Sequence, residues 1–494
     1  MTALCLRRNA PSSSKVRQLS DLNTARKKAR ATRTLWATVT AALMASAAPA
    51  QVVSPYPVAE TQTLDLAKQA ISLRSVRGPG NQTPQVAALF KQALVAGGFA
   101  ENDVTITPVD DTAYLIARWP GSDATLKPLV ISGHMDVVEA NPADWQRDPF
   151  TPVVENGYLY GRGATDMKFE AALAIASLSQ LKREGYKPKR TIIIEFSGDE
   201  ETAMKTSEII ADKLRDTELI LNIDGGGGVL DEKTGKPKYL AWTASEKTYA
   251  DFELIVTNPG GHSSRPSKIN AINQLSAALD KIANYQFKPE LNEITKAWFT
   301  QAATFEEPQI GAAMRAFAAD PTDKDAIATL TANPATIGRI GTTCISTMVD
   351  AGHARNALPQ RATANINCRI FPGKKPTDIM AELEKVVGNS SVKFNYILEG
   401  SVAAGPSPLR SDLVAAVERS IHKIYPGLPI FPVQASGGTD CVFSRRLAVP
   451  CYGIGPTFMK ESDEFSHGLN ERTPIMNIRP GINYYLSLFR TLSR

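Results

Sequence analysis

The sequence predicts an α/β protein with a mixed sheet flanked by helices and a second, smaller α+β domain inserted into it. Three observations lead to this prediction. Short apolar runs at 129–132, 191–196 and 219–223 alternate with helical patterns, which is typical of a sheet covered by helices. A later stretch has the order β-α-β-β-α-β of a ferredoxin-like domain. With 494 residues the chain also exceeds the size at which one core keeps growing.

The first domain is expected over residues 51–245 and 401–494. After a polar lead-in, Gln51–Thr63, its expected elements are a helix over Leu64–Leu73, strands within Val104–Arg118, a strand at Leu129–Ser132, a helix over Phe169–Glu184, a strand at Thr191–Phe196, a helix over Thr206–Lys213 and a strand at Leu219–Ile223. The later part adds a helix over Ser411–Ile424, strands at Ile430–Gln434 and Val449–Gly453, and a helix over Asn477–Leu492. The three apolar runs named first are each followed by candidate site residues, which predicts a site at the carboxyl ends of the strands.

The inserted domain is expected over residues 246–400. Its six elements are a strand at Tyr249–Thr257, a helix over Lys268–Ala283, strands at Thr343–Val349 and Ala362–Ile370, a helix over Pro376–Val387 and a strand at Val392–Leu398. The polar, helix-rich stretch from about 285 to 338 interrupts this order and is interpreted as an insertion.

The net charge of +5 comes from the first 50 residues, which hold nine Lys and Arg against one acid. The remaining chain has 46 basic and 49 acidic residues, so it gives no reason to expect a nucleic acid or an anionic membrane as partner. The glycine run 225–228 follows a strand but lacks the GxGxxG spacing of a phosphate cradle. A turn is predicted there, and a nucleotide-binding oxidoreductase is disfavoured.

Residues 1–50 have the order of a signal peptide. A basic region reaches Arg33, an apolar run covers Leu35–Ala48, and Ala48-Pro49-Ala50 forms a cleavage site before Gln51. The alternatives are a start further along the chain, a retained signal anchor or a cytosolic tail. The prediction is a secreted or periplasmic protein that no membrane holds once the signal is removed.

Four cysteines remain after Ala50, namely Cys344, Cys368, Cys441 and Cys451. An even number permits two disulfides in an oxidising compartment without demanding them. No spacing typical of a zinc finger occurs, so the cysteines are interpreted as buried thiols or bridges.

Five chain segments supply the residues of a metal site. Asp166 directly precedes an apolar helix pattern, where the helix dipole favours an ionised carboxylate. The other candidate ligands are His134, Glu201, Asp224 and His467. If Asp166 is shared, each of two ions has three protein ligands and an open position, and the mixture of His and carboxylates favours Zn²⁺.

Two further carboxylates are assigned supporting roles. Glu200 and Glu201 are adjacent, so they point in different directions, and one can bind metal while the other acts as general base toward water. Asp136 lies two residues beyond His134, which suits a carboxylate that fixes the tautomer of that imidazole.

The ordered motifs resemble those of the M20 clan of co-catalytic zinc exopeptidases and amidohydrolases. The motifs are HMD at 134–136, GRGATDMK at 161–168, DEE at 199–201, NID at 222–224, GGHSSRP at 260–266 and SHGLNE at 466–471. The resemblance runs from about residue 60 to the end. It implies a zinc-exopeptidase-like catalytic domain and a lid or dimerisation domain.

The resemblance also implies roles for the metal-site residues. His134 and Asp224 would hold one zinc, Glu201 and His467 the other, and Asp166 would bridge them, with Co²⁺ or Mn²⁺ as alternatives. Glu200 would be the general base. The Asp166-Met167 peptide bond would be cis. Asp224 stands where aminoacylases and some carboxypeptidases of the clan have Glu, a difference that points toward peptide substrates.

Five further residues gain roles by the same resemblance. His262 would polarise the scissile carbonyl, from the same chain or from a partner protomer. Asn356 and Arg369 would bind substrate, with Arg369 gripping a free carboxylate unless it forms an interdomain salt bridge. Gly437 and Gly438 begin a loop, Gly437–Asp440, that would wall the substrate, although Asp440 could instead cap a helix.

The predicted function is hydrolysis of a peptide bond next to a free carboxylate by water activated at two zinc ions. Hydrolysis of N-acyl amino acids is the alternative within this class. A non-catalytic binding protein is the alternative from another class, and loss of Glu200 or of a ligand would favour it. The expected partners are a small peptide or N-acyl amino acid and a second copy of the chain, bound through the lid domain.

Overall fold

A computed structural model of the chain describes residues 54–398 and 400–494. The expected signal peptide, residues 1–50 with cleavage after Ala50, lies outside these residues. Within the described residues, every helix is too short or too polar to cross a bilayer. The described residues from 54 onward form one compact unit.

The described residues form thirteen α-helices and four short 3₁₀ turns. The helices are α1 Pro57–Ile71, α2 Thr83–Ala96, α3 Lys168–Arg183, α4 Lys205–Lys213, α5 Ala271–Ala283, α6 Glu293–Ala302, α7 Pro308–Ala319, α8 Lys324–Thr331, α9 Pro334–Ile337, α10 Pro376–Val387, α11 Ser411–His422, α12 Cys441–Arg446 and α13 Ile478–Leu492. Short 3₁₀ turns lie at η1 Glu101–Asp103, η2 Pro142–Asp144, η3 Glu461–Asp463 and η4 Ile475–Asn477.

The strands fall into two large and two small sheets. They are β1 Val104–Val109, β2 Thr112–Trp119, β3 Leu129–His134, β4 Val153–Glu155, β5 Tyr158–Tyr160, β6 Ile192–Ser197, β7 Leu219–Asn222, β8 Gly227–Leu230, β9 Pro237–Glu246, β10 Thr248–Thr257, β11 Gly261–His262, β12 Thr343–Ala351, β13 Ala357–Leu358, β14 Arg361–Ile370, β15 Val392–Ile397, β16 Ile430–Ala435, β17 Cys451–Gly453, β18 Phe458–Met459 and β19 Arg472–Pro474. The small sheets are β19-β5-β4 and β11-β13.

The larger sheet is mixed, as the sequence predicts. Its order is β1-β2-β6-β3-β7-β17-β9-β8-β18, with β16 paired to β9. Strands β6, β3, β7 and β17 run parallel to one another, whereas β2 pairs with β6 in the antiparallel sense. All residues of β3, β6 and β7 are buried, which explains why these strands read as continuous apolar runs.

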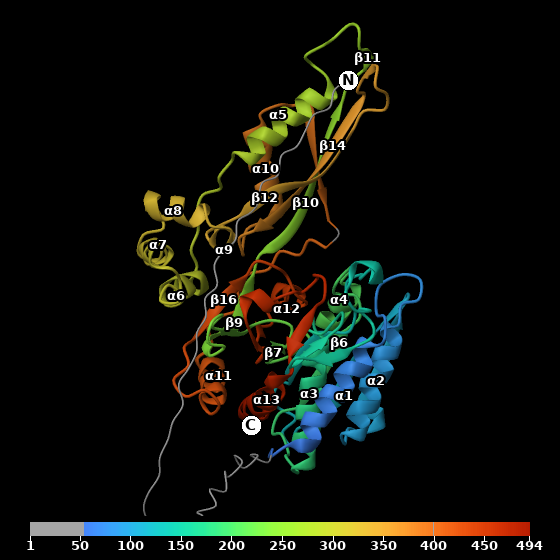
Figure 1. Ribbon diagram of the computed structural model, residues 1–494, viewed down its shortest axis with the longest axis vertical. Coiled ribbons are helices and arrows are strands. Elements are labelled where there is room, and N and C mark those ends of the chain that lie inside the picture. Colours follow the sequence, from blue (N-terminus) through green and yellow to red (C-terminus); the bar gives the residue numbers. More distant parts are fainter. Residues whose placement is uncertain (1–53, 399) are drawn as a thin grey trace, which may run out of the picture. The chain divides into compact units, whose positions relative to one another are not determined.

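Helices cover both faces of this sheet (Figure 1). One face packs against α1, α2, α3, α11 and α13 in the largest core cluster. The other face packs against α4 and α12 through a smaller cluster that includes Ile210, Leu214 and Cys441. The sheet is therefore buried on both faces, so its polar side chains gather at the strand ends.

The second large sheet is antiparallel and has the order β12-β14-β10-β15. Its elements follow the predicted order β-α-β-β-α-β, and α5 and α10 pack on its buried face. Alternate residues of β10 and β14 are buried, while the residues between them are partly exposed. A single residue, Lys247, joins β9 of the first sheet to β10 of this one.

The predicted insertion is helical, and it contacts the first sheet. Helices α6 to α9 occupy Glu293–Ile337. Phe299, Met314 and Phe317 of these helices share a core cluster with Phe431 of β16. Asn292 and Arg339, at the two ends of the stretch, both hydrogen-bond to Gln434 of the same strand. The insertion therefore buttresses the strand that leads into the loop at 436–440.

Three local predictions are wrong. The lead-in predicted for 51–63 is helical from Pro57, because Pro57 suits the first turn of α1 and Ala59 and Thr63 bury against the core. The glycine run predicted as a turn enters β8 at Gly227, where pairing with β9 and β18 overrides the low strand propensity of glycine. The helix predicted from Lys268 starts at Ala271, after Asn270 caps it.

All four remaining cysteines form disulfides. Cys344 pairs with Cys368 across the adjacent strands β12 and β14, and Cys441 of α12 pairs with Cys451 of β17. Both bridges tie together segments that lie near the candidate substrate-binding residues.

Candidate metal centre

The candidate ligands meet because their strands are parallel neighbours. Strand β3 ends at His134 and lies between β6 and β7. The turn after β6 carries Glu200 and Glu201, and Asp224 follows β7 by two residues. The carboxyl ends of parallel neighbours share one edge of the sheet, so these side chains converge there.

Asp166 lies between two histidines that are far apart in the sequence. Its Oδ1 is 3.0 Å from Nε2 of His134, and its Oδ2 is 3.1 Å from Nε2 of His467. Each carboxylate oxygen therefore faces a different imidazole. Nε2 of His467 is also 2.9 Å from Oε2 of Glu201, and Nε2 of His134 is 3.7 Å from Oδ2 of Asp224. The five predicted ligands thus form one continuous cluster.

Three of these residues have ligand atoms especially close together. One atom each from His134, Asp166 and Glu201 lies within 4.8 Å of the other two. His134 is buried, whereas the side chain of His467 is 54% exposed. His467 also has a φ of 61°, a conformation that is uncommon for residues other than glycine and often found at functional sites.

Asp136 supports the cluster differently from the prediction. The nearest acceptor to Nδ1 of His134 is the backbone oxygen of Asp136, at 3.1 Å, whereas the Asp136 carboxylate is 3.6 Å away. That carboxylate instead accepts the backbone amides of Glu200 and Glu201, each at 3.0 Å. Asp136 therefore positions both glutamates, and its backbone oxygen favours the His134 tautomer whose Nε2 is free to bind a metal.

The backbone beside Asp166 is closely packed. The Asp166-Met167 peptide bond is cis, as the resemblance implies. Sδ of Met167 accepts the amide of His134 at 3.0 Å. A Cβ atom on Gly133 would lie 2.6 Å from Cε of Met167, so a larger residue there would displace the end of this side chain.

Glu471 is a site residue to which sequence reasoning gave no role. It is fully buried, and its carboxylate accepts the amides of Gly163, Thr165 and Asp166 and the guanidinium of Arg162. Glu471 therefore holds the whole 162–166 loop. The sequence shows an acid at position 471, at the end of the SHGLNE motif. It does not show that this acid binds the 162–166 loop, which lies about 300 residues earlier in the chain.

The cluster carries an excess of negative charge. Burial raises the pKa of Glu200 well above its usual value, raises that of Glu201, and raises that of Asp224 to about 6. Burial opposes protonation of His134, yet Asp224 and its neighbouring carboxylates raise the pKa of this histidine well above normal. Hydrogen bonds to Asp166 and Glu201 raise the pKa of His467 to about 10.

These properties fit metal binding. Several buried carboxylates surround only two imidazoles, so bound cations would relieve a repulsion that the protein otherwise carries. Imidazole nitrogen and carboxylate oxygen are also the donors that suit zinc and related transition metals. The residues present are therefore able to hold cations at this edge of the sheet.

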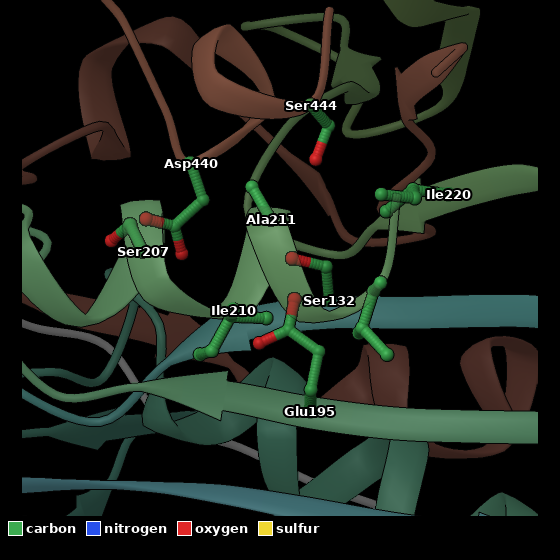
Figure 2. Close-up of a pocket in the computed structure, with 9 residues that line it drawn as sticks. Ser132, Glu195, Ser207, Ile210, Ala211, Ile220, Asp440 and Ser444 are labelled. Carbon is green, nitrogen blue, oxygen red and sulfur yellow. The ribbon is translucent and has the colours of Figure 1, made fainter. Parts of the chain in front are cut away.

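Asp440 belongs to a buried network behind the cluster. It stands at the N-terminus of α12 but does not cap the helix through its side chain. Its Oδ2 accepts the hydroxyl of Ser197 at 2.7 Å. Figure 2 shows Asp440 and Glu195 at a small cavity that is also lined by serines. Burial raises the pKa of Asp440 to about 6 and that of Glu195 well above normal.

The structure leaves three predicted substrate residues apart from the cluster. Among the described residues, no hydrogen bond or ion pair joins His262, Asn356 or Arg369 to the five ligands. His262 and Asn356 are exposed, and the backbone oxygen of Asn356 accepts the amide of Ser263. Arg369 is half-buried on β14 and makes no ion pair with any described carboxylate, so the interdomain salt bridge considered for it is absent there.

Gly437 and Gly438 lie in the exposed loop between β16 and α12. A Cβ atom on either glycine would meet no other atom within 4 Å. Packing therefore does not require glycine here. The predicted role of both residues in walling the substrate stays a prediction.

The chain is similar to known metallopeptidases along most of its length. The model of peptidase family M20/M25/M40 matches residues 130–491. Probable carboxypeptidase S-like 2 of Dictyostelium discoideum is 28% identical over 389 residues, which cover 77% of this chain and 74% of the relative. The N-fatty-acyl-amino acid synthase/hydrolase PM20D1 of Xenopus tropicalis is 29% identical over 381 residues, which cover 75% and 73%.

Solved structures share the fold. The M20 family metallo-carboxypeptidase Sso-CP2 from Sulfolobus solfataricus superposes with a TM-score of 0.67 and 18% identity, covering 87% of this chain and 98% of its own. The Bacillus subtilis YXEP protein, a dinuclear metal binding peptidase from the M20 family, has a TM-score of 0.53 and 15% identity, covering 88% and 99%.

Proposed function

This chain belongs to peptidase family M20/M25/M40 and is a hydrolase of the metallopeptidase type, and we propose that it cleaves a peptide bond next to a free carboxylate. The observation that carries the proposal is the placement of Asp166, whose two oxygens face two different histidines. Such a carboxylate is suited to lie between two cations.

Two zinc ions fit the surrounding donors. His134 and Asp224 would hold one ion, Glu201 and His467 the other, and Asp166 both, with Co²⁺ or Mn²⁺ as alternatives. The dinuclear centre of a solved structure with the same fold supports this count. When bound, the two cations would polarise the scissile carbonyl and lower the pKa of water.

Glu200 is the proposed general base. Asp136 fixes its backbone through the amide at 3.0 Å, and its side chain is buried beside the cluster. The raised pKa of Glu200 suits a group that takes a proton from the attacking water and delivers it to the leaving amine. Bound cations would lower this pKa, because positive charge favours the ionised carboxylate.

His262 is suited to donate a hydrogen bond to the developing oxyanion. Its Nδ1 accepts the backbone amide of Ser264 at 3.1 Å, so in the neutral ring Nε2 carries the proton. A donor of this kind, supplied by the same chain or by a partner protomer, stabilises negative charge in the transition state. Asn356, Arg369, Gly437 and Gly438 are proposed to bind substrate, with Arg369 on its free carboxylate.

Hydrolysis of N-acyl amino acids is the second candidate. It is favoured by the similarity to an N-fatty-acyl-amino acid synthase/hydrolase, whose name describes an amino acid that carries an acyl group on its nitrogen. Both candidates require the same free carboxylate and the same metal centre. They differ only in the group on the other side of the amide.

Export of the protein is part of the proposal. The two disulfides support an oxidising compartment, because such bridges are rare where thiols are kept reduced. The basic and apolar order of residues 1–50 supports the same conclusion.

We also propose that residues 246–400 pair two copies of the chain.

Metal analysis combined with a substrate screen tests the proposal. Protein that begins at Gln51 would be assayed with dipeptides, longer peptides and N-acyl amino acids. We expect two equivalents of transition metal and turnover of free-acid peptides. Turnover of N-acyl amino acids alone would establish the second candidate. Metal-loaded protein that hydrolyses neither group would establish a non-catalytic binding protein.

A further inference from the structure

Lys247 is a buried cation at the joint between the two large sheets. Its side chain is 1% exposed, and it is the only residue between β9 and β10. Its Nζ donates to the hydroxyl of Thr343 at 3.1 Å, and its backbone amide donates to the oxygen of Ala435 at 3.1 Å. Thr343 is neutral, so this contact leaves the charge uncompensated.

The neighbouring carboxylates are already paired with other side chains. Among the described residues, no carboxylate lies within ion-pair distance of Lys247. Glu246, the preceding residue, pairs with Arg445 at 3.0 Å and accepts the hydroxyl of Thr439. Asp251, on the following strand, accepts hydrogen bonds from Tyr249, Asn365 and Asn367. Neither acid is free to neutralise the lysine.

A second cation lies beside the first. Arg369 of β14 is paired in register with Tyr249 of β10 and with Thr343 of β12, so the three form a row across the sheet. Lys247 reaches this row by donating from Nζ to the hydroxyl of Thr343. The guanidinium carbon of Arg369 lies 4.8 Å from the centre of the Tyr249 ring. Stacking fixes the plane of the guanidinium and leaves its N–H edge available to a planar anion.

The strands that carry this row are held rigidly. The disulfide Cys344–Cys368 crosslinks β12 and β14 at the positions next to Thr343 and Arg369. Burial, together with the charge of Arg369, lowers the pKa of Lys247 to about 7. The fold thus holds two positive charges close together, at a cost in repulsion and in desolvation of the lysine. An anion bound between them would offset this cost.

A chain of contacts links this pair to the metal centre. The amide of Asp224 donates to Oδ1 of Asn222 at 2.6 Å, and Nδ2 of Asn222 donates to the hydroxyl of Thr439 at 3.4 Å. That hydroxyl donates to Glu246 at 2.6 Å, and Glu246 immediately precedes Lys247. Lys247 is therefore three polar contacts and one peptide bond away from a proposed metal ligand.

We propose that Lys247 and Arg369 together bind the carboxylate of the substrate. The inference rests on the proposed function, which requires a free carboxylate beside the scissile bond. Lys247 supplies a point charge, and Arg369 supplies a planar fork of donors. The ligand class is an organic carboxylate, and an uncharged amide of the same shape would be rejected because it leaves the buried Lys247 and the half-buried Arg369 unpaired.

Calorimetric titration in a Glu200→Gln background tests the proposal without turnover. The probes are N-acetyl-leucine, which carries the carboxylate, and N-acetyl-leucinamide, which does not. We expect Lys247→Met to weaken binding of the acid by about 10- to 100-fold and to leave binding of the amide unchanged. Lys281→Met is the control for loss of a lysine at an exposed position, where Nζ donates to the backbone oxygen of Val387.

A conservative variant gives a second readout. Lys247 is protonated below its pKa, so affinity for the acid should fall as pH rises through about 7. Lys247→Arg should bind the acid without this fall, because arginine stays charged. The groups that face Lys247 from other elements are Arg369, Thr343 and the oxygen of Ala435, and only the lysine titrates in this range.

The outcomes separate this inference from the proposed function. Equal loss of acid and amide binding in Lys247→Met, no loss of either, or no binding of the acid by the parental protein would each overturn it. If the parental enzyme hydrolyses no substrate but Lys247→Met still loses the acid selectively, the reaction is wrong and the carboxylate site stands. If the enzyme is active and the affinity for the acid is unchanged in Lys247→Met, the reaction stands and the site is wrong.

Discussion

Glu471 holds Asp166 by accepting its backbone amide at 3.0 Å, although 305 residues separate the two in the sequence. The same carboxylate accepts the guanidinium of Arg162 at 2.6 Å, and both partners are buried. The proposed bridging carboxylate is thus positioned by a second carboxylate that is not itself a proposed metal ligand. Residues that orient ligands in this way usually influence metal affinity strongly.

Replacing Glu471 with Gln should weaken both the metal centre and the fold. An amide nitrogen in place of one oxygen would face an N–H donor, and Arg162 would lose its counter-charge. We expect metal affinity to fall by about 10- to 100-fold and the free energy of unfolding to fall by about 3–5 kcal/mol. Zinc titration and denaturant unfolding measure the two effects. Glu464→Gln, at an exposed position, is the control, and equal behaviour of the two variants would contradict the prediction.

Most of the first sheet could be predicted because its strands are buried on both faces. Strands β3, β6 and β7 are continuous apolar runs, and no tertiary information is needed to recognise them. Strand β8 could not be recognised, because it begins with glycines that only pairing with β9 and β18 holds extended. The sequence pattern places the start of α1 too late, because the residues from Pro57 to Thr63 are too polar to show the apolar periodicity of a helix.

The candidate site, like the fold, could be predicted only in part from the sequence. The types of residue at 134, 166, 201, 224 and 467 identify the chemistry, and parallel strand ends explain why they meet. Sequence spacing predicts that the Asp136 carboxylate contacts His134, two residues away. The carboxylate lies 3.6 Å from Nδ1 of His134, but its hydrogen bonds are to the amides of Glu200 and Glu201. Lys247 lies outside all the motifs recognised in the sequence. Its significance depends on which carboxylates around it are already paired, and only the fold determines this.

Removing the metals should abolish activity reversibly. Without cations the buried carboxylates of the cluster repel one another, so we also expect the melting temperature to fall on chelation. Restoring two equivalents of zinc should recover both properties, which metal analysis, an activity assay and thermal unfolding would follow together. Full activity in protein that retains only traces of transition metal would exclude the proposed centre.

Glu200→Gln should lower kcat without releasing metal. Glutamine keeps the volume of the side chain but cannot accept the proton, so we expect kcat to fall by about 10²- to 10⁴-fold. Glu201→Gln is the informative comparison, because it should lose metal as well as activity. Measured metal content and kcat distinguish the two. A Glu200→Gln enzyme with parental kcat would assign the base elsewhere.

Asp136→Asn should affect Glu200 and Glu201 together. The side chain of asparagine offers one acceptor oxygen where the carboxylate offers two, so one of the two glutamate amides would lose its buried partner. We expect kcat to fall by about 10- to 100-fold and metal affinity to weaken by a similar factor. If His134 were the true partner of the carboxylate, only metal affinity would change, and kcat of the fully loaded enzyme would match the parent.

Glu170 should make the stability of the fold depend on pH. It is 6% exposed on α3, and Thr457 and Tyr485 donate hydrogen bonds to its carboxylate. Burial raises its pKa from 4.5 to about 7. Below about 4.5 the group is protonated in the folded and unfolded chains alike, so it costs nothing. As pH rises toward about 7 the unfolded chain loses its proton more readily and is favoured, and above that value the penalty is constant.

The penalty corresponds to about 3 kcal/mol at neutral pH and above, since each unit of pKa shift is worth about 1.4 kcal/mol. Glu170→Gln removes the titrating group and keeps a partner for both hydroxyls. The free energy of unfolding of this variant minus that of the parent should therefore increase between pH values of about 4.5 and 7 and then stay level. Denaturant unfolding across this range measures the difference, in which contributions from all other groups cancel. A difference that does not vary with pH would show that the buried carboxylate of Glu170 keeps its ordinary pKa.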